Sequence, residues 1–290
     1  MKKKILQPQD FNKSKKLATT DIATVFQLNN GDILKIYHPG IVQIQKIAGL
    51  DVEAKILSAQ PLKNSPEILV PTSAVYTPNN IFCGYTMPYA KGIDFNVFDD
   101  RLTIEQRMDL HKYAKIHYKL ESVLRRNQNI VFPDFCTCDN IFIDSKENIQ
   151  FIDYDGIQIG NHKSNSLSTS LGDPEQYLHN PKYFTKNQFF TKELDKKSSI
   201  ILFYLTAFNV NLNKIGTYNP FTGNTITLED IFECLNLNDP DICHKTYKIF
   251  NNNQDNDFLG KDILNLAEKY DLQIMYHTNN TYIKRLVKKK

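Results

Sequence analysis

The sequence predicts an α+β fold, in which a small antiparallel sheet with one helix precedes a mainly helical part. Over roughly the first ninety residues, apolar and polar positions alternate between strong turn signals, which is typical of strands. From Thr103 onward the apolar residues recur at helical spacing instead. The hydrophobic share of 41%, with 18 Phe and 15 Tyr in 290 residues, supplies enough apolar side chains for a packed core.

The sheet part is expected to contain two hairpins separated by a helix. Asn29-Asn30-Gly31 is a strong turn signal between the first two strands. Apolar residues then recur at roughly helical spacing, so we expect one amphipathic helix that ends before Pro61. The expected strands span residues 23–28, 32–37, 69–76 and 81–87, and the helix spans residues 41–57.

The helical part is expected to begin with a long, capped helix. Thr103 lies three residues before Gln106, which is the spacing of a capping box. A later helix is so rich in apolar residues that it must be buried on most sides. The expected helices span residues 103–126, 193–208, 227–235 and 261–270.

Composition and charge exclude several classes of function. The formal net charge is only +3, and much of it comes from lysine runs at residues 2–4 and 288–290, which we interpret as solvated tails. Nucleic-acid binding usually needs a more concentrated basic face, so it is not expected. No apolar run is long enough for a signal peptide or a membrane span, which predicts a soluble, cytoplasmic protein without a membrane partner.

The cysteines form neither a disulfide framework nor a zinc site. Cys136 and Cys138 are close in sequence, but no second Cys or His pair follows at a spacing typical of zinc ligands. The unpaired set indicates a reducing compartment. The other three are Cys83, Cys234 and Cys243.

Asn140 and Asp153 are the strongest candidates for metal ligands. They flank a predicted hairpin with its turn at residues 145–148, which would bring an amide oxygen and a carboxylate towards one point. Hard oxygen ligands of this kind suit Mg²⁺, which is often held by one or two protein groups and the phosphates of a nucleotide. An ordinary turn role for Asn140 is the alternative.

This order of elements resembles the bilobed protein-kinase fold. An N-lobe at residues 1–88 would hold the sheet and one helix, and a C-lobe at residues 89–290 would hold the helices, the catalytic hairpin and the activation segment. In that family a catalytic-loop Asn and the Asp of D-F-G hold the metal ions. The resemblance therefore implies ATP and Mg²⁺ as cofactors, with Asn140 and Asp153 as the metal ligands.

The resemblance also implies a lysine that contacts the nucleotide phosphates. Lys35 lies in Ile33-Leu34-Lys35-Ile36-Tyr37, at the place of the V-A-I-K strand. Glu53, in the predicted helix, is then expected to be its ion-pair partner. The alternatives are a solvent-facing lysine on an edge strand and a glutamate that is only a surface charge.

The segment from Gly84 to Gly92 resembles the connector between the lobes. Pro88 lacks an N–H donor, so the contacts with adenine would fall on Tyr89 and Ala90. Met87 would lie at the back of the pocket, and Val25 would also contact the nucleotide. An ordinary loop is the alternative for this segment.

Asp134 is expected to be the catalytic base. It lies six residues before Asn140, whereas the family pattern H-R-D-x-x-x-x-N has five, so we infer one extra residue in the loop. Asp139 is a rival candidate. The usual loop lysine is absent, and Thr137 is a candidate partial substitute.

Other positions match or depart from the family pattern. Asp195 matches the buried Asp that ties a helix to the catalytic loop, and residues 172–175 occupy the place of A-P-E. Residues 17–25 contain no glycine, although the phosphate-covering loop is usually glycine-rich. The D-F-G position reads Asp153-Tyr154-Asp155-Gly156, and Asp155 could support the metal site or only satisfy a turn.

The leading functional prediction is ATP- and Mg²⁺-dependent phosphoryl transfer to a Ser or Thr hydroxyl of a protein substrate. One alternative is an enzyme of the same fold that acts on a small molecule or transfers the nucleotide. Another is a pseudokinase that serves as a binding module, which the absent loop lysine favours.

Overall fold

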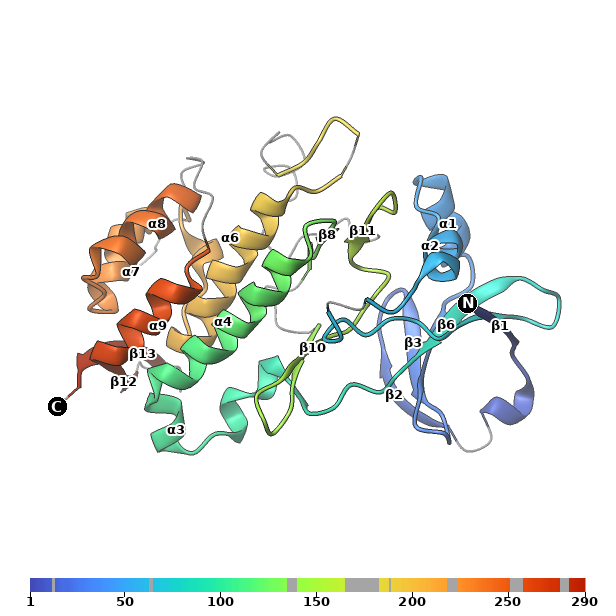
Figure 1. Cartoon of the computed structure of the whole chain (residues 1–290), viewed down its shortest axis with the longest axis horizontal. Helices are drawn as coiled ribbons and strands as arrows, with labels where there is room; N and C mark the ends of the chain where they lie inside the picture. Colours follow the sequence, from blue (N-terminus) through green and yellow to red (C-terminus); the bar gives the residue numbers. More distant parts are fainter. Residues whose placement is uncertain are drawn as a thin grey trace.

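The computed structural model describes residues 1–11, 14–62, 65–134, 140–164, 183–187, 189–217, 224–250, 258–276 and 282–289. It confirms a mixed α+β fold with a sheet that is mainly antiparallel at the N-terminal end and helices that predominate later. Figure 1 shows the sheet at one end of the molecule and helices α4, α6 and α9 at the other.

Six strands form the first sheet, in the order β1-β5-β6-β4-β3-β2. Neighbouring strands are antiparallel, except that β1 runs parallel to β5. The four strands predicted from the sequence are present, and two more extend the sheet at its edges. The strands are β1 (Lys2–Ile5), β2 (Lys15–Thr19), β3 (Ala23–Gln27), β4 (Ile33–Tyr37), β5 (Ser73–Tyr76) and β6 (Phe82–Met87).

The expectation of one helix beside the sheet is wrong, because two short helices occupy that region. They are α1 (Ile41–Ile47) and α2 (Val52–Ser58). Gly49 between them has a φ of 79°, a left-handed conformation that ends a helix and that glycine adopts without steric cost. The carboxylate of Asp51 then accepts a bond from Ala54 N (2.9 Å), which caps the start of α2.

The two faces of the sheet pack against different partners. Val25, Lys35 and Tyr85 lie directly opposite one another on β3, β4 and β6, so they share the inner face. The outer face carries a small core of its own, covered by the segment that follows β1. In that core, Phe11 packs edge-on against Phe26, with ring centroids 5.4 Å apart.

Phe11→Ala is expected to lower the free energy of unfolding by about 2 kcal/mol, because it removes a partly buried ring and leaves a cavity. Urea denaturation would measure the change. Ile47→Ala is the control, since that side chain is 88% exposed and its loss should cost almost nothing. An equal loss in both variants would show that Phe11 does not anchor the outer core.

The helical part follows a short connection. The predicted capping box at Thr103 and Gln106 is confirmed, but the long helix expected from Thr103 is interrupted at Asp109, which caps a new helix through a bond from His111 N (2.9 Å). The helices are α3 (Ile104–Met108), α4 (Leu110–Arg126), α6 (Lys192–Phe203), which continues as a π-helical turn (Tyr204–Phe208), α7 (Leu228–Cys234), α8 (Pro240–Phe250) and α9 (Gly260–Lys269).

Short strands in this part position the candidate site. A three-stranded sheet has the order β10-β9-β7, and β8 pairs with β11. The backbone from Glu67 to Leu69 runs beside β10, with bonds from Phe151 N to Glu67 O (2.8 Å) and from Leu69 N to Phe151 O (2.9 Å). These bonds join the two parts of the molecule. The strands are β7 (Ile93–Asp94), β8 (Ile130–Val131), β9 (Ile141–Ile143), β10 (Ile149–Phe151) and β11 (Gln158–Ile159).

Most of the described lysines at the two ends are exposed, as expected, but the expectation that these ends are frayed tails is wrong, because strands include residues 2–4 and Lys288. Residues 2–4 lie in β1, and Lys288 ends a hairpin of β12 (Tyr270–Tyr276) and β13 (Tyr282–Lys288), which the sequence analysis missed. No helix among the described residues is long and apolar enough to cross a bilayer.

A buried polar cluster attaches this second hairpin to the helices. Lys284 on β13 is fully buried and donates to Asp99 Oδ1 (2.9 Å) and to the Tyr113 hydroxyl (3.0 Å). It also donates to the carbonyl of Thr206 (3.1 Å). The hydroxyls of Tyr113 and Tyr282 both donate to the Asp99 carboxylate. Each member of the cluster is therefore hydrogen-bonded, as a buried polar group must be.

Candidate functional site

A short hairpin places Asn140 beside Asp153. Ile141 pairs with Phe151, and a bond from Ile152 N to Asn140 O (3.0 Å) continues the pairing to the hairpin's end. Both predicted metal ligands therefore lie at that end, as their spacing indicated. Together with Asp134 they line one small pocket, whose other lining residues are Phe132, Pro133, Phe151, Ile152, Gly156 and Ile157.

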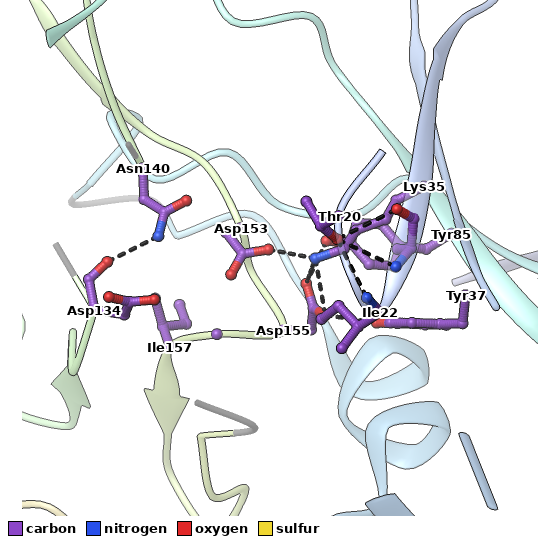
Figure 2. A network of polar contacts seen from close by, with 12 residues as sticks. Thr20, Ile22, Lys35, Tyr37, Tyr85, Asp134, Asn140, Asp153, Asp155 and Ile157 are labelled. Atoms are coloured by element: carbon purple, nitrogen blue, oxygen red, sulfur yellow. Dashed lines mark hydrogen bonds and ion pairs between the residues drawn. The ribbon is translucent and has the colours of Figure 1, made fainter. Parts of the chain in front are cut away.

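The Asn140 side chain is oriented by the backbone of Asp134, the predicted base. Its amide nitrogen donates to the backbone carbonyl of Asp134 (2.8 Å), as Figure 2 shows. The bond sets the amide orientation, and it leaves the Oδ1 atom as the available acceptor. Among the described residues, no hydrogen-bond donor contacts that oxygen, which suits a role as a metal ligand.

Asp153 is held in a strained backbone conformation. Its φ is 60°, which is rare for a residue with a side chain and which clusters at functional sites. Gly156 N donates to the Asp153 carbonyl (2.8 Å), and a Cβ at position 156 would collide with the Asp153 carboxylate. Glycine is therefore required at position 156 if Asp153 is to keep this position.

Lys35 reaches the hairpin from the sheet. Its ammonium contacts Asp153 Oδ1, and it also pairs with both carboxylate oxygens of Asp155, at 2.9 and 3.0 Å. Figure 2 shows Asn140, Asp153 and Lys35 following one another across the site. A cation from β4 and two oxygen-bearing side chains from the β9–β10 hairpin are thus brought to one place.

No protein-family model matches the chain, and no curated protein matches it.

The expected ion pair between Lys35 and Glu53 is wrong. Glu53 instead accepts a hydrogen bond from the Tyr76 hydroxyl (2.8 Å), and among the described residues the carboxylates that pair with Lys35 are those of Asp153 and Asp155. From the sequence, Asp155 is expected only to support the metal site or to satisfy a turn. Its identity as an ion-pair partner depends on the packing of two distant segments.

Asp155 is the most fully bonded carboxylate of the site. It is completely buried, and the hydroxyls of Tyr85 (2.6 Å) and Tyr37 (2.7 Å) donate to its two oxygens. Burial alone would raise the pKa of Asp155, but Lys35 and the two hydroxyls outweigh it and hold that pKa well below its usual value. Asp155 is therefore ionised at neutral pH.

Burial and the neighbouring charges of the same cluster, which includes Asp155, shift the pKa values of both Asp153 and Lys35. Burial, followed by the nearby Asp155 charge, raises the pKa of Asp153, and Lys35 opposes this rise. Burial would lower the pKa of Lys35, yet the two carboxylates outweigh it and raise that pKa above its usual value. Lys35 therefore remains a cation across the ordinary pH range.

Lys55 is a functional candidate that the sequence analysis missed. It lies on α2, is almost fully buried, and donates to the backbone carbonyls of Asp155 (2.7 Å), Ile157 and Lys163 (3.2 Å). Burial lowers its pKa to about 8, and the Asp155 charge opposes this shift. α2 is thereby attached to the segment that follows Asp153.

The connector residues lie near the sheet end of the site. Met87 and Ala90 are buried, whereas Tyr89 is 45% exposed. Val25 is directly opposite Lys35 on the neighbouring strand, so it shares the inner face. The roles of these residues in nucleotide binding stay predictions.

Asp195 makes the contact expected of it. Its Oδ1 atom accepts a bond from Phe132 N (2.8 Å), two residues before Asp134, and its other oxygen pairs with Lys192. This buried carboxylate ties the start of α6 to the segment that carries Asp134. Asp139, Thr137 and residues 172–175 lie outside the described residues.

The residues present fit a magnesium ion shared with a nucleotide. In the part of the chain that the structure describes, no group of three or more His, Cys, Asp and Glu residues could hold a metal by itself. Asn140 and Asp153 would supply two oxygen ligands, and Mg²⁺ commonly takes the rest from phosphate and water. The donor set therefore suits a nucleotide-bound ion better than a resident structural one.

Proposed function

We propose that this chain is an ATP- and Mg²⁺-dependent phosphotransferase with a bilobed, kinase-like fold, acting on a Ser or Thr hydroxyl of a protein. One observation carries the proposal: Lys35 from the sheet contacts Asp153 at the pocket that Asn140 and Asp134 also line. A scaffold would have no need of a cation, two metal ligands and a carboxylate at one point.

Each residue has a distinct task in the proposal. Lys35 contacts the phosphates, and Asn140 and Asp153 hold the metal. Asp134 accepts the proton of the attacking hydroxyl. Bound Mg²⁺ would supply neutralisation of the charge that develops on the phosphoryl oxygens. The protein then acts mainly by positioning the reacting groups, with Asp195 fixing the segment that carries Asp134 through Phe132.

Transfer from ATP with label in the γ- or the α-phosphate tests the proposal. The γ-label should appear on a protein acceptor in the presence of Mg²⁺, and the α-label should not. Appearance of the α-label would identify nucleotide transfer instead. Absence of both labels, over a panel of protein and small-molecule acceptors, would contradict the proposal.

Asp134→Asn is expected to lower the transfer rate about 10² to 10⁴-fold, because it removes a general base. The variant keeps the backbone carbonyl that orients Asn140, so its urea-unfolding midpoint should be unchanged. Asp241→Asn, on the exposed side of α8, is the matched control and should retain full activity. Full activity in Asp134→Asn would remove this residue from the mechanism.

A binding module of the same fold is the second candidate. It is favoured by the fact that the Lys35 ammonium already contacts two carboxylates, so a phosphate would have to compete with them. Thermal stabilisation by ATP without transfer of either label would support this candidate.

A further inference from the structure

We propose that Asp155, held in place by Tyr37 and Tyr85, is the positioning residue for Lys35. The inference rests on the proposed function, since it assigns the residue that places the phosphate-contacting cation. It differs from the arrangement expected from the sequence, in which Glu53 on the helix would have that role.

Each carboxylate oxygen of Asp155 accepts a hydrogen bond from Lys35 and one from a tyrosine hydroxyl. Its Oδ1 atom accepts from Lys35 (2.9 Å) and Tyr85 (2.6 Å), and its Oδ2 atom accepts from Lys35 (3.0 Å) and Tyr37 (2.7 Å). Lys35 and Tyr37 belong to β4, and Tyr85 belongs to the adjacent β6. The carboxylate is thus fixed against two paired strands, so the position of the ammonium is defined by the sheet.

The two carboxylates near Lys35 differ in exposure. The side chain of Asp153 is 25% exposed at the pocket, whereas that of Asp155 is fully buried. The contact with Asp153 can therefore give way to phosphate oxygens, while the contact with Asp155 remains. Phosphate oxygens therefore have to replace only Asp153 as a partner of Lys35. The pairing with Asp155 keeps the ammonium in position.

The helix makes a different contribution. Glu53 accepts the Tyr76 hydroxyl, and Lys55, two residues later, donates to the carbonyls of Asp155 and Ile157. α2 therefore supports the backbone that carries Asp155 and does not contact Lys35 through Glu53. Placement of the cation depends on this buried cluster.

A double-mutant cycle on the nucleotide-free protein tests the pairing. Lys35→Met, Asp155→Asn and the double variant would be compared by urea denaturation. We expect the double variant to lose clearly less stability than the two single losses combined. The matched cycle of Lys35→Met with Glu53→Gln should be additive. Additive losses with Asp155, or coupling with Glu53, would overturn the proposal.

Nucleotide binding provides a second readout that general loosening of the fold would not imitate. In Asp155→Asn, the affinity for Mg²⁺-ATP should fall about 10- to 100-fold, because a misplaced ammonium loses a charge-assisted hydrogen bond to the phosphates, while the affinity for adenosine stays unchanged. If that variant does not fold, Tyr85→Phe removes one hydroxyl from Asp155 and should produce a smaller loss of the same kind. Equal losses for both ligands, or none, would contradict the positioning role.

The two proposals fail in different ways. A wild-type protein that transfers no label, yet shows the coupling and the ATP-specific loss, would refute transfer and leave the role of Asp155 standing. An active protein with additive stability losses would refute the role of Asp155 alone.

Discussion

Asp153→Asn is expected to lower kcat/KM for phosphoryl transfer about a thousandfold or more. The substitution replaces the charged carboxylate of the proposed metal ligand by a neutral amide of the same size, and metal-derived charge stabilisation is worth several kcal/mol of the barrier. Asp153 also contacts Lys35, so the neutral amide weakens the attraction both to the proposed metal ion and to the Lys35 ammonium. A small stability change is expected, because burial already disfavours the charged form of Asp153.

The measurement should separate metal binding from folding. In the wild type, thermal stabilisation by ATP should increase when Mg²⁺ is added, and in Asp153→Asn this increase should disappear. Asp51→Asn is the matched control, since asparagine caps a helix as well as aspartate does and the residue lies outside the pocket. Persistence of the Mg²⁺-dependent increase in Asp153→Asn would place the ion elsewhere.

Lys55→Met is expected to lower the free energy of unfolding by about 3 to 5 kcal/mol. The ammonium donates to three backbone carbonyls in a largely buried place, and the loss of each of these hydrogen bonds costs about 1 to 3 kcal/mol. Methionine fills most of the volume but offers no hydrogen. The loss should therefore come from the three missing hydrogen bonds and little from a cavity.

Urea denaturation with two variants would measure this effect. Lys46→Met is the control, because Lys46 is exposed on α1 and its replacement should change stability by less than about 0.5 kcal/mol. A loss below about 1 kcal/mol in Lys55→Met would show that water or backbone movement satisfies the carbonyls instead.

The local part of the site could be predicted from the sequence. Two short apolar runs around a polar turn predict the hairpin that joins Asn140 to Asp153. The turn signal Asn29-Asn30-Gly31 predicts the strand that contains Lys35. These features depend on neighbours within a few residues. The capping box at Thr103 is of the same kind.

The partner of Lys35 could not be predicted in the same way. Glu53 and Lys55 lie about 200° apart around a helix, so the residue that faces the site depends on the helical phase. The break at Gly49 resets that phase, and a continuous helix from residue 41 does not reproduce it. Asp155 was recognisable as a second carboxylate near Asp153, but its pairing requires Tyr37 and Tyr85 to be placed in space.

The first strand of the second hairpin, β12, has a sequence pattern from which it could have been predicted. Tyr270, Leu272 and Ile274 alternate with the polar residues Asp271 and Gln273, which is typical of a half-buried strand. The lysines at residues 288–290 instead led to the prediction of a solvated tail. β1 left no comparable pattern, because its lysines are mostly exposed at the sheet edge.

The attachment of β13 to the helices has a practical consequence for anyone who shortens this chain. Cutting before Tyr270 would take away Lys284 and Tyr282, so Asp99 would keep a negative charge in a half-buried place after losing two of its described partners, while Tyr113 and Arg107 would remain. The hairpin therefore belongs to the smallest fragment worth producing, although it lies far from the pocket in sequence.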